Sequence, residues 1–297
     1  MEKIKKDEYE IRREKLNKLS DQMVVYKDKY EVTEKLENIK KLEQGVHVKI
    51  AGRIISKRSF GKFMFINLYD INGIAQVSIS KQDLAEDFNL FKKDIDIGDF
   101  IGVEGIVYTT GTGVKTVQVS NGCLLSKAVR PLPEKYHGIS DSDIKYRQRY
   151  LDIISNDSTR TTFKKRIQIL NDIKDYLRLN DFAEVETPIL QNVASGANAR
   201  PFITKHNALD EDFYLRIAPE LYLKQVVESG FNRVFELGKN FRNEGMDASH
   251  LQDFTMLECY AAYYNYKDNM ILLEKMLKTV IEKVFGTLQV TINDKVI

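Results

Sequence analysis

Short runs of alternating hydrophobic and polar residues occupy the chain between residues 46 and 126, separated by glycines, among them Gly73 of the pair Asn72-Gly73. Side chains of a strand alternate between two faces, so Met64, Ile66 and Leu68 are expected inside and Phe63 and Phe65 on the opposite face. Five strands in about 80 residues predict a small β-barrel. The predicted strands are Val46–Ile50, Phe63–Leu68, Ile74–Ile79, Phe100–Val107 and Val114–Val119.

Two regions have the spacing of helices. Residues 1–43 are rich in Lys, Glu and Leu and predict an exposed helical extension, whose charged face we interpret as solvated rather than bound to RNA. Between residues 160 and 180, apolar residues recur every three or four positions and predict an amphipathic helix. Its expected buried stripe is Phe163, Ile167, Leu170, Ile173 and Leu177.

All five prolines follow residue 130, and Pro131 and Pro133 predict an extended linker because proline fixes φ and disfavours helix at the preceding residue. A second domain that mixes helices and strands follows. We therefore expect an α+β protein with a helical extension at 1–43, a barrel domain at 44–128, a linker at 129–150 and a second domain at 151–297.

Composition narrows the class of protein. Hydrophobic residues make up 43% of the chain without any run long enough to span a membrane, and the charged N-terminus does not resemble a signal peptide, so we expect no membrane role and a cytoplasmic location. The two cysteines are far apart and form no Cys-x-x-Cys pair, which argues against a disulfide framework and a structural zinc site. With 45 basic and 43 acidic residues, net charge alone does not identify a nucleic-acid-binding protein.

The outer face of the barrel carries candidate nucleic-acid contacts. Phe63 and Phe65 are expected there, and cations stand close by in sequence. Aromatic rings stack on bases and cations bind phosphates, which together suit single-stranded nucleic acid. The alternative, an aromatic pair that packs against the linker, stays open from this pattern. The neighbouring cations are Arg53, Lys57, Arg58 and Lys62.

A long antiparallel hairpin is expected near the C-terminus, with strands Val234–Glu244 and Asp253–Tyr263 joined by Gly245–Gln252. One face of this hairpin combines charged and aromatic side chains, which would be costly in a core and useful around a ligand that has both an anion and a cation. A surface ladder of salt bridges is the alternative. The residues of this face are Glu236, Asn240, Arg242, Glu244, Phe254, Met256, Glu258 and Tyr260.

Several segments resemble a known family. Phe182–Pro188 looks like motif 1 of the class II aminoacyl-tRNA synthetases, and Phe241–Glu244 with His250 and Phe254 looks like motif 2. The resemblance to lysyl-tRNA synthetases in particular implies an N-terminal OB-fold, an antiparallel catalytic sheet and a homodimer built partly on motif 1, with Pro188 at its interface. The segments most similar to that group are Gly196–Phe202, His206–Leu209, Leu215–Lys224 and Phe254–Tyr260, with Tyr146–Tyr150 and Gly61-Lys62 extending the match.

The resemblance also implies roles for individual residues. Arg242 is the expected catalytic residue, which binds the α-phosphate of ATP and the carboxylate of lysine. Glu244, His250 and Phe254 are expected to bind ATP. Lysine would be held by Gly196, Glu220, Glu258 and Tyr260, with Arg242, and the anticodon by Arg58, Phe65 and Gln76. The implied reaction is activation of lysine by ATP with Mg²⁺, followed by transfer from lysyl-adenylate to tRNA(Lys).

The sequence departs from the family pattern in three places. It ends at Ile297 before any segment that resembles motif 3, so we expect an incomplete catalytic domain without its magnesium ligands, and hence no metal site within this chain. In the motif 2 loop, Ser249, Leu251 and Gln252 replace the usual Arg, Asn and Pro. Val114 stands where the family commonly has a Glu near the anticodon.

Two alternatives to lysine ligation stay open. A non-catalytic tRNA-binding or regulatory relative would retain the barrel but not activate an amino acid. An aspartyl- or asparaginyl-tRNA synthetase would share the architecture, although Glu258 in the pocket would repel aspartate.

Overall fold

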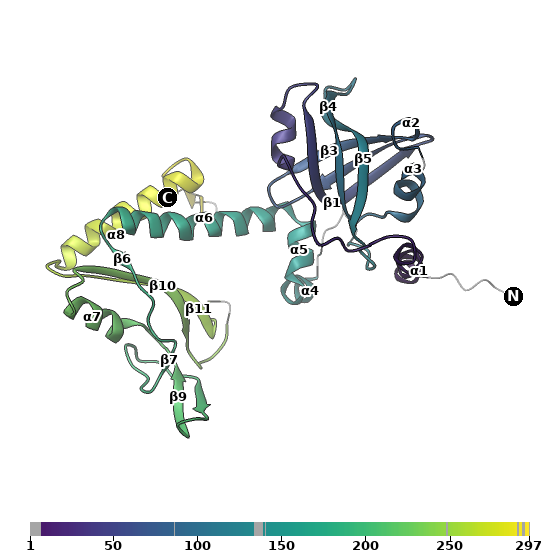
Figure 1. Cartoon of the computed structure of the whole chain (residues 1–297). Coiled ribbons are helices and arrows are strands. Elements are labelled where there is room, and N and C mark those ends of the chain that lie inside the picture. Colours follow the sequence, from purple (N-terminus) through teal and green to yellow (C-terminus); the bar gives the residue numbers. More distant parts are fainter. Residues whose placement is uncertain are drawn as a thin grey trace. The chain divides into compact units, whose positions relative to one another are not determined.

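The computed structural model describes residues 7–85, 87–133, 139, 141–247, 249–289, 291–292 and 295–296. The chain forms two compact units, Met1–Arg160 and Thr161–Ile297, and Figure 1 shows the elements of each. Among the described residues, no helix has the length and apolar character that crossing a membrane requires.

A closed five-stranded barrel forms the centre of the first unit, as predicted, with strand order β1-β2-β3-β5-β4. Neighbouring strands are antiparallel except for the parallel pair β3 and β5. Met64, Ile66 and Leu68 are fully buried, which confirms the predicted inner face of β2. All five strands end later than predicted, and β1 and β5 exceed the prediction most. The strands are β1 (His47–Phe60), β2 (Phe63–Tyr69), β3 (Ile74–Ser80), β4 (Phe100–Thr109) and β5 (Lys115–Ser126).

Short helices surround this barrel. Asp7 caps α1 (Glu8–Ser20) through a capping box, and Leu19 at its end enters the barrel core. Leu36 and Ile39 of η1 (Leu36–Lys41) join the same core, whereas Ile11 remains exposed. The other short helices are α2 (Lys81–Leu84), α3 (Asp87–Asn89), η2 (Leu90–Asp94), α4 (Ser142–Arg147) and α5 (Arg149–Ser155). Of the predicted linker, residues 134–138 and 140 lie outside the described residues.

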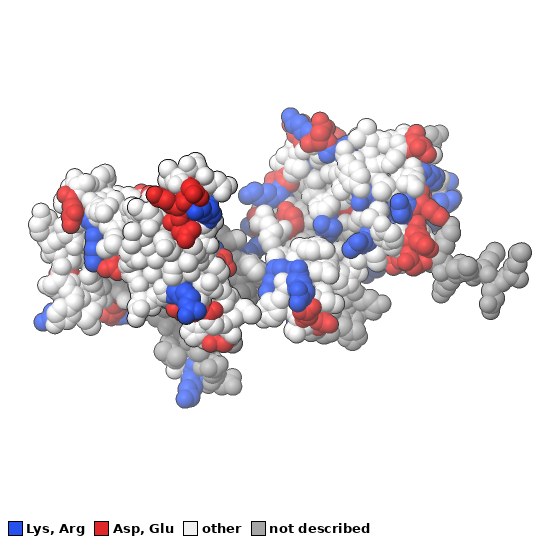
Figure 2. Space-filling model, turned by 90° about the horizontal axis from the view of Figure 1, so that it is seen from below, with Lys and Arg blue, Asp and Glu red and all other residues white. Residues whose placement is uncertain are grey.

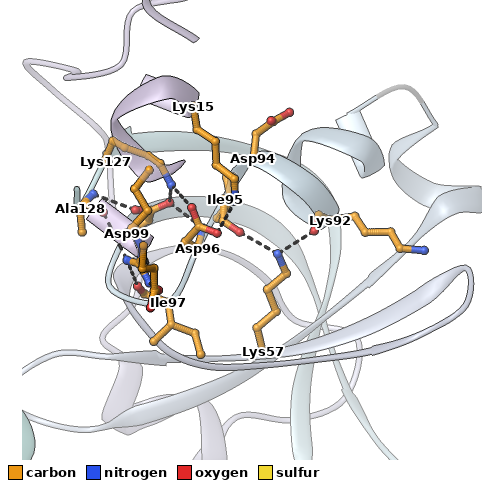
Figure 3. A network of polar contacts seen from close by, with 12 residues as sticks. Lys15, Lys57, Lys92, Asp94, Ile95, Asp96, Ile97, Asp99, Lys127 and Ala128 are labelled. Atoms are coloured by element: carbon orange, nitrogen blue, oxygen red, sulfur yellow. Dashed lines mark hydrogen bonds and ion pairs between the residues drawn. The ribbon is translucent and has the colours of Figure 1, made fainter. Parts of the chain in front are cut away.

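An ionic network fastens α1 to the barrel (Figure 3). The Lys127 ammonium is fully buried and donates to Asp99 at 2.7 Å and to Asp96 at 2.6 Å. Lys15 of α1 donates to the other oxygen of Asp96 at 2.6 Å. Burial alone would raise the pKa of Asp96, but hydrogen bonds from Lys127 and Lys15 outweigh it and hold the pKa below its ordinary value. The extension is thus bound to the barrel by charge as well as by apolar contact.

The second unit holds α6 (Asp157–Leu179) from Thr161 onward, with α8 (Tyr266–Phe285) beside it (Figure 1). Leu177 of α6 packs with Phe235, Leu272 and Met276 in one core. The predicted stripe is wrong at Ile167, which is 60% exposed. Helical spacing identifies an apolar face but does not show which element covers it. The residues of α6 that reach this core are Ile169, Ile173, Tyr176 and Leu177.

The described residues of the second unit also form two three-stranded sheets and a two-stranded sheet of β12 and β13. One three-stranded sheet has strand order β11-β10-β6, in which β6 is parallel to β10, and the other has order β7-β9-β8. With the barrel, these sheets and helices confirm an α+β protein. The elements are β6 (Ala183–Glu184), β7 (Leu190–Gln191), β8 (Ile203–His206), β9 (Glu211–Leu215), α7 (Glu220–Glu228), β10 (Arg233–Phe241), β11 (Asp253–Ala261), β12 (Thr291–Ile292) and β13 (Lys295–Val296).

Candidate active site

The predicted hairpin is present as β10 and β11, which pair antiparallel along their whole length. Glu236 lies directly opposite Glu258, and Asn240 directly opposite Phe254, so these side chains share one face as expected. The first strand, β10, ends at Phe241, before the predicted end at Glu244. Arg242 follows it, although its N–H still bonds the Gln252 carbonyl at 2.9 Å.

The residues expected to bind ATP surround one cavity of about 250 Å³ at the loop that joins the two strands of the hairpin. The Arg242 guanidinium lies 5.1 Å from the centre of the Phe254 ring. Glu244 accepts a hydrogen bond from the Arg200 N–H at 3.3 Å, and the Asn243 N–H donates to the Arg200 carbonyl at 2.7 Å. The cavity is lined by Arg242, Glu244, Gly245, Ser249, His250, Leu251 and Phe254.

The loop that carries His250 is held by one carboxylate. Asp247 accepts from the Ser249 N–H at 2.7 Å and from the His250 N–H at 2.9 Å, and lies 2.7 Å from the His250 Nδ1. The hydrogen bond from the Ser249 N–H is the main reason that the pKa of Asp247 is below its ordinary value. The Ser249 hydroxyl also donates to Asp247 at 2.9 Å, so the replacement Ser249 has a side-chain contact of its own in this loop.

The residues expected to bind lysine form a second cluster. The Tyr260 hydroxyl donates to Glu258 at 3.1 Å. The Lys224 ammonium pairs with Glu220 at 2.5 Å and lies 6.0 Å from the centre of the Tyr260 ring. Gly196 adopts φ of +87°, and a Cβ there would lie 3.1 Å from the Glu220 Cβ. The structure thus brings all four predicted pocket residues together, with Lys224 as a neighbour that the sequence did not single out.

This second cluster is electrostatically negative. The pKa of Glu258 is raised, mainly by burial. The hydrogen bond from Tyr260 lowers this pKa, whereas the negative charges of Glu220 and Glu236 raise it further. Burial likewise raises the pKa of Tyr260, so its hydroxyl keeps its proton. A cationic ligand would lower the repulsion between these carboxylates.

Two residues near the loop end of the hairpin have buried polar atoms that a ligand could bind. Asn240 is 1% exposed, yet neither atom of its amide has a hydrogen-bond partner among the described residues. The buried Nε of Arg242 also has none in that part of the chain. Each unpaired buried polar group costs about 1–3 kcal/mol, so bound substrate or water would stabilise this strip of the hairpin.

Arg216 and Thr187 take part in the site, although sequence reasoning gave them no role. Arg216 is 2% exposed and pairs with Glu236 at 2.5 Å. Thr187 donates its hydroxyl to the second oxygen of Glu236 at 2.7 Å. The feature of the sequence that could have identified Arg216 is the position of this charged residue within the apolar run Leu215–Ala218.

The residues expected to read the anticodon share the outer face of the barrel. Arg58 on β1 pairs directly with Phe65 on β2, and Phe63 contacts Phe65 edge to face with ring centres 4.9 Å apart. On β3, Gln76 accepts from the Thr116 hydroxyl at 2.9 Å. Figure 2 shows acidic and basic residues interspersed on the side of the molecule that it displays.

The described residues contain no group of three or more His, Cys, Asp or Glu side chains placed to hold a metal ion. Mg²⁺ that binds together with ATP takes most of its ligands from phosphates and water, so it does not depend on such a group.

Comparison with known proteins places this site in a family. Residues 141–296 match the family of class II tRNA synthetases for D, K and N, the one-letter codes of aspartate, lysine and asparagine. The chain belongs to this family. Residues 48–122 match the OB-fold nucleic acid binding domain, in agreement with the closed barrel.

Curated relatives carry the name lysine–tRNA ligase. The protein of Erwinia tasmaniensis is 49% identical over 252 residues, which are 84% of this chain and 50% of the relative. The protein of Enterobacter sp. (strain 638) is 44% identical over 301 residues, which cover 98% of this chain and 60% of the relative. The match to the protein of Salmonella paratyphi B has the same identity and coverage. The chain thus spans 50% to 60% of the length of these class II synthetases.

Proposed function

We propose that this class II synthetase activates lysine with ATP and transfers the lysyl group to tRNA(Lys). The observation that carries the proposal is the pairing of two sites on one hairpin, a cavity at Arg242 and Phe254 and a negative cluster around Glu258. The names of the relatives point to the same reaction.

The negative cluster supports lysine over the other two amino acids of the family. Glu220 and Glu258 provide carboxylates for two ammonium groups, and the Tyr260 oxygen adds a polar contact. Aspartate would bring its side-chain carboxylate close to Glu258, and asparagine would bring no side-chain cation to it.

In the first step, a carboxylate oxygen of lysine attacks the α-phosphorus of ATP. The bond to the bridging oxygen breaks, and pyrophosphate leaves with the electron pair. Arg242 binds both reacting anions, because a planar guanidinium can donate to two oxygens at once and stabilise the charge that develops. Glu244, His250 and Phe254 hold the nucleotide, with Phe254 stacked on adenine. Arg242 must then turn away from the Phe254 ring on which it lies.

In the second step, a hydroxyl of the terminal tRNA ribose attacks the carbonyl carbon of lysyl-adenylate, and AMP leaves with the electron pair of the broken bond. The barrel binds the anticodon through Arg58, Phe65 and Gln76. These three side chains share one face, where the ring of Phe65 can stack on a base. ATP is a substrate here, with Mg²⁺ as the expected ion. Translation takes place in the cytoplasm, which is therefore the proposed compartment.

A homodimer is part of the proposal. Pro188 is exposed at the end of motif 1, and three large apolar side chains that follow it are exposed as well. Such a group of exposed apolar residues is typical of a protein interface. The three are Ile189, Leu190 and Val193.

The test is amino-acid-dependent exchange of pyrophosphate into ATP by the intact gene product, with lysine, aspartate and asparagine in parallel. Exchange with lysine alone supports the proposal. Exchange with aspartate or asparagine instead refutes the substrate, and no exchange with any of the three favours a tRNA-binding relative without activation chemistry.

A further inference from the structure

Arg216 forms the centre of a closed polar cluster beneath the hairpin. Its Nη1 donates to Glu236 at 2.5 Å and to the Thr187 hydroxyl at 3.0 Å. The same hydroxyl donates to the other oxygen of Glu236 at 2.7 Å, and the Thr187 N–H also approaches that oxygen, at 3.2 Å. Both oxygens of the buried carboxylate are therefore occupied, and the three side chains hold one another in a single arrangement.

The same arginine also holds the backbone around the site. Its Nε donates to the Lys239 carbonyl at 2.8 Å, and its carbonyl accepts from the Phe241 N–H at 2.9 Å. Lys239 and Phe241 flank Asn240, and Phe241 directly precedes Arg242. One buried residue thus fixes the end of β10 from which the expected catalytic arginine departs.

Arg216 connects this strand to the other parts of the site. Its N–H donates to the Ile189 carbonyl at 2.9 Å, next to motif 1. Four residues further along the chain is Glu220, the expected partner of the lysine α-ammonium. Its pair Glu236 stands opposite Glu258 across the hairpin. Displacement of Arg216 would therefore move groups at both ends of the substrate.

The stability of the folded protein does not by itself explain why these charged residues are buried together. A buried ion pair can often be replaced by apolar residues of similar volume without loss of stability, because burial of the charges offsets most of their attraction. Alignment of reacting groups gives a stronger reason, since an error of about 1 Å in a catalytic site can lower the rate about 100-fold.

We propose that Arg216, held by Glu236 and Thr187, is a positioning residue for amino-acid activation that fixes Arg242 and Glu220 relative to each other. The role rests on the proposed function, because it needs the activation step as its readout. Arg216 does not contact substrate in this role. It acts through the backbone at Lys239 and Phe241 and through the loop that leads to Glu220.

The first test is the double variant Arg216→Met/Glu236→Met in the intact gene product. We expect it to unfold within a few degrees of the wild-type temperature, because the apolar pair fills the buried space. The kcat of lysine-dependent exchange should fall about 100-fold, while KM for lysine and ATP changes less than about fivefold, since alignment matters most in the transition state. A folded double variant with kcat within about threefold of wild type overturns the role.

A second pair of variants serves if the double variant does not fold. Thr187→Val removes the hydroxyl at nearly constant volume and should lower kcat about tenfold, while Thr187→Ser keeps the hydroxyl and should restore most of that loss. Equal kcat for the Val and Ser variants overturns the positioning role. No exchange by the wild-type protein with any of the three amino acids overturns the proposed function and this role together, whereas an active wild type with undiminished variants overturns the role alone.

Discussion

Gly238 has no side chain because the Arg216 guanidinium occupies the space beside it. A Cβ at this position would lie 2.3 Å from Nη2 of Arg216 and 3.1 Å from Oε1 of Glu236. Arg216 is 2% exposed and is held by four acceptors, so it cannot move into solvent without breaking its pair. We therefore predict that Gly238→Ala destabilises the second unit strongly.

The expected loss follows from the ion pair. Removal of one partner of a buried pair costs about 3–5 kcal/mol, and Gly238→Ala displaces the guanidinium without removing it, so the lower end of about 3 kcal/mol applies. For a unit of this size that corresponds to a decrease of roughly 10 °C in the unfolding temperature. Differential scanning calorimetry and urea unfolding of the intact gene product measure both quantities.

Gly245→Ala is the matched control, because a Cβ there meets nothing within 4 Å. Its free energy of unfolding should change by less than about 1 kcal/mol. An unfolding temperature for Gly238→Ala within about 2 °C of wild type would refute the reasoning, since about 3 kcal/mol cannot be lost with so small a change.

Three further predictions concern other parts of the chain. Phe65→Leu should weaken tRNA(Lys) binding about tenfold in a filter-binding assay, because one stacked base contributes about 1–3 kcal/mol, and undiminished affinity would count against the anticodon face. Glu258→Gln should raise the KM for lysine about 10- to 100-fold in exchange, the equivalent of one charged hydrogen bond, and an unchanged KM would remove Glu258 from the pocket. Burial lowers the pKa of Lys57 to about 8 from the 10.5 of a free side chain, so between these values the unfolded chain binds more protons. Lys57 therefore makes the free energy of unfolding rise with pH between these two values. Lys57→Met should reduce this rise when the free energy is measured by urea unfolding at several pH values. The same dependence on pH in both proteins would contradict the lowered pKa.

Local patterns of the sequence determined the elements. Alternation along Phe63–Leu68 was enough to place Met64, Ile66 and Leu68 in the barrel core, because the side chains of a strand must alternate whatever surrounds it. The same parity put Glu236 and Asn240 on one face of the hairpin, where they face Glu258 and Phe254. The roles expected of the motif residues came from their resemblance to class II synthetases, and parity alone did not assign them.

Tertiary structure alone decided how these elements are covered and joined. The spacing that predicted a buried stripe on α6 was not sufficient at Ile167, since an apolar face stays exposed where no other element of its unit packs on it. The partners of Arg216 lie 20 residues or more away in sequence, and no local period relates Thr187, Glu236 and Lys239 to it. A buried charge takes whichever partners the packed chain brings within hydrogen-bond distance, so its role became visible only when the strands and loops were in place.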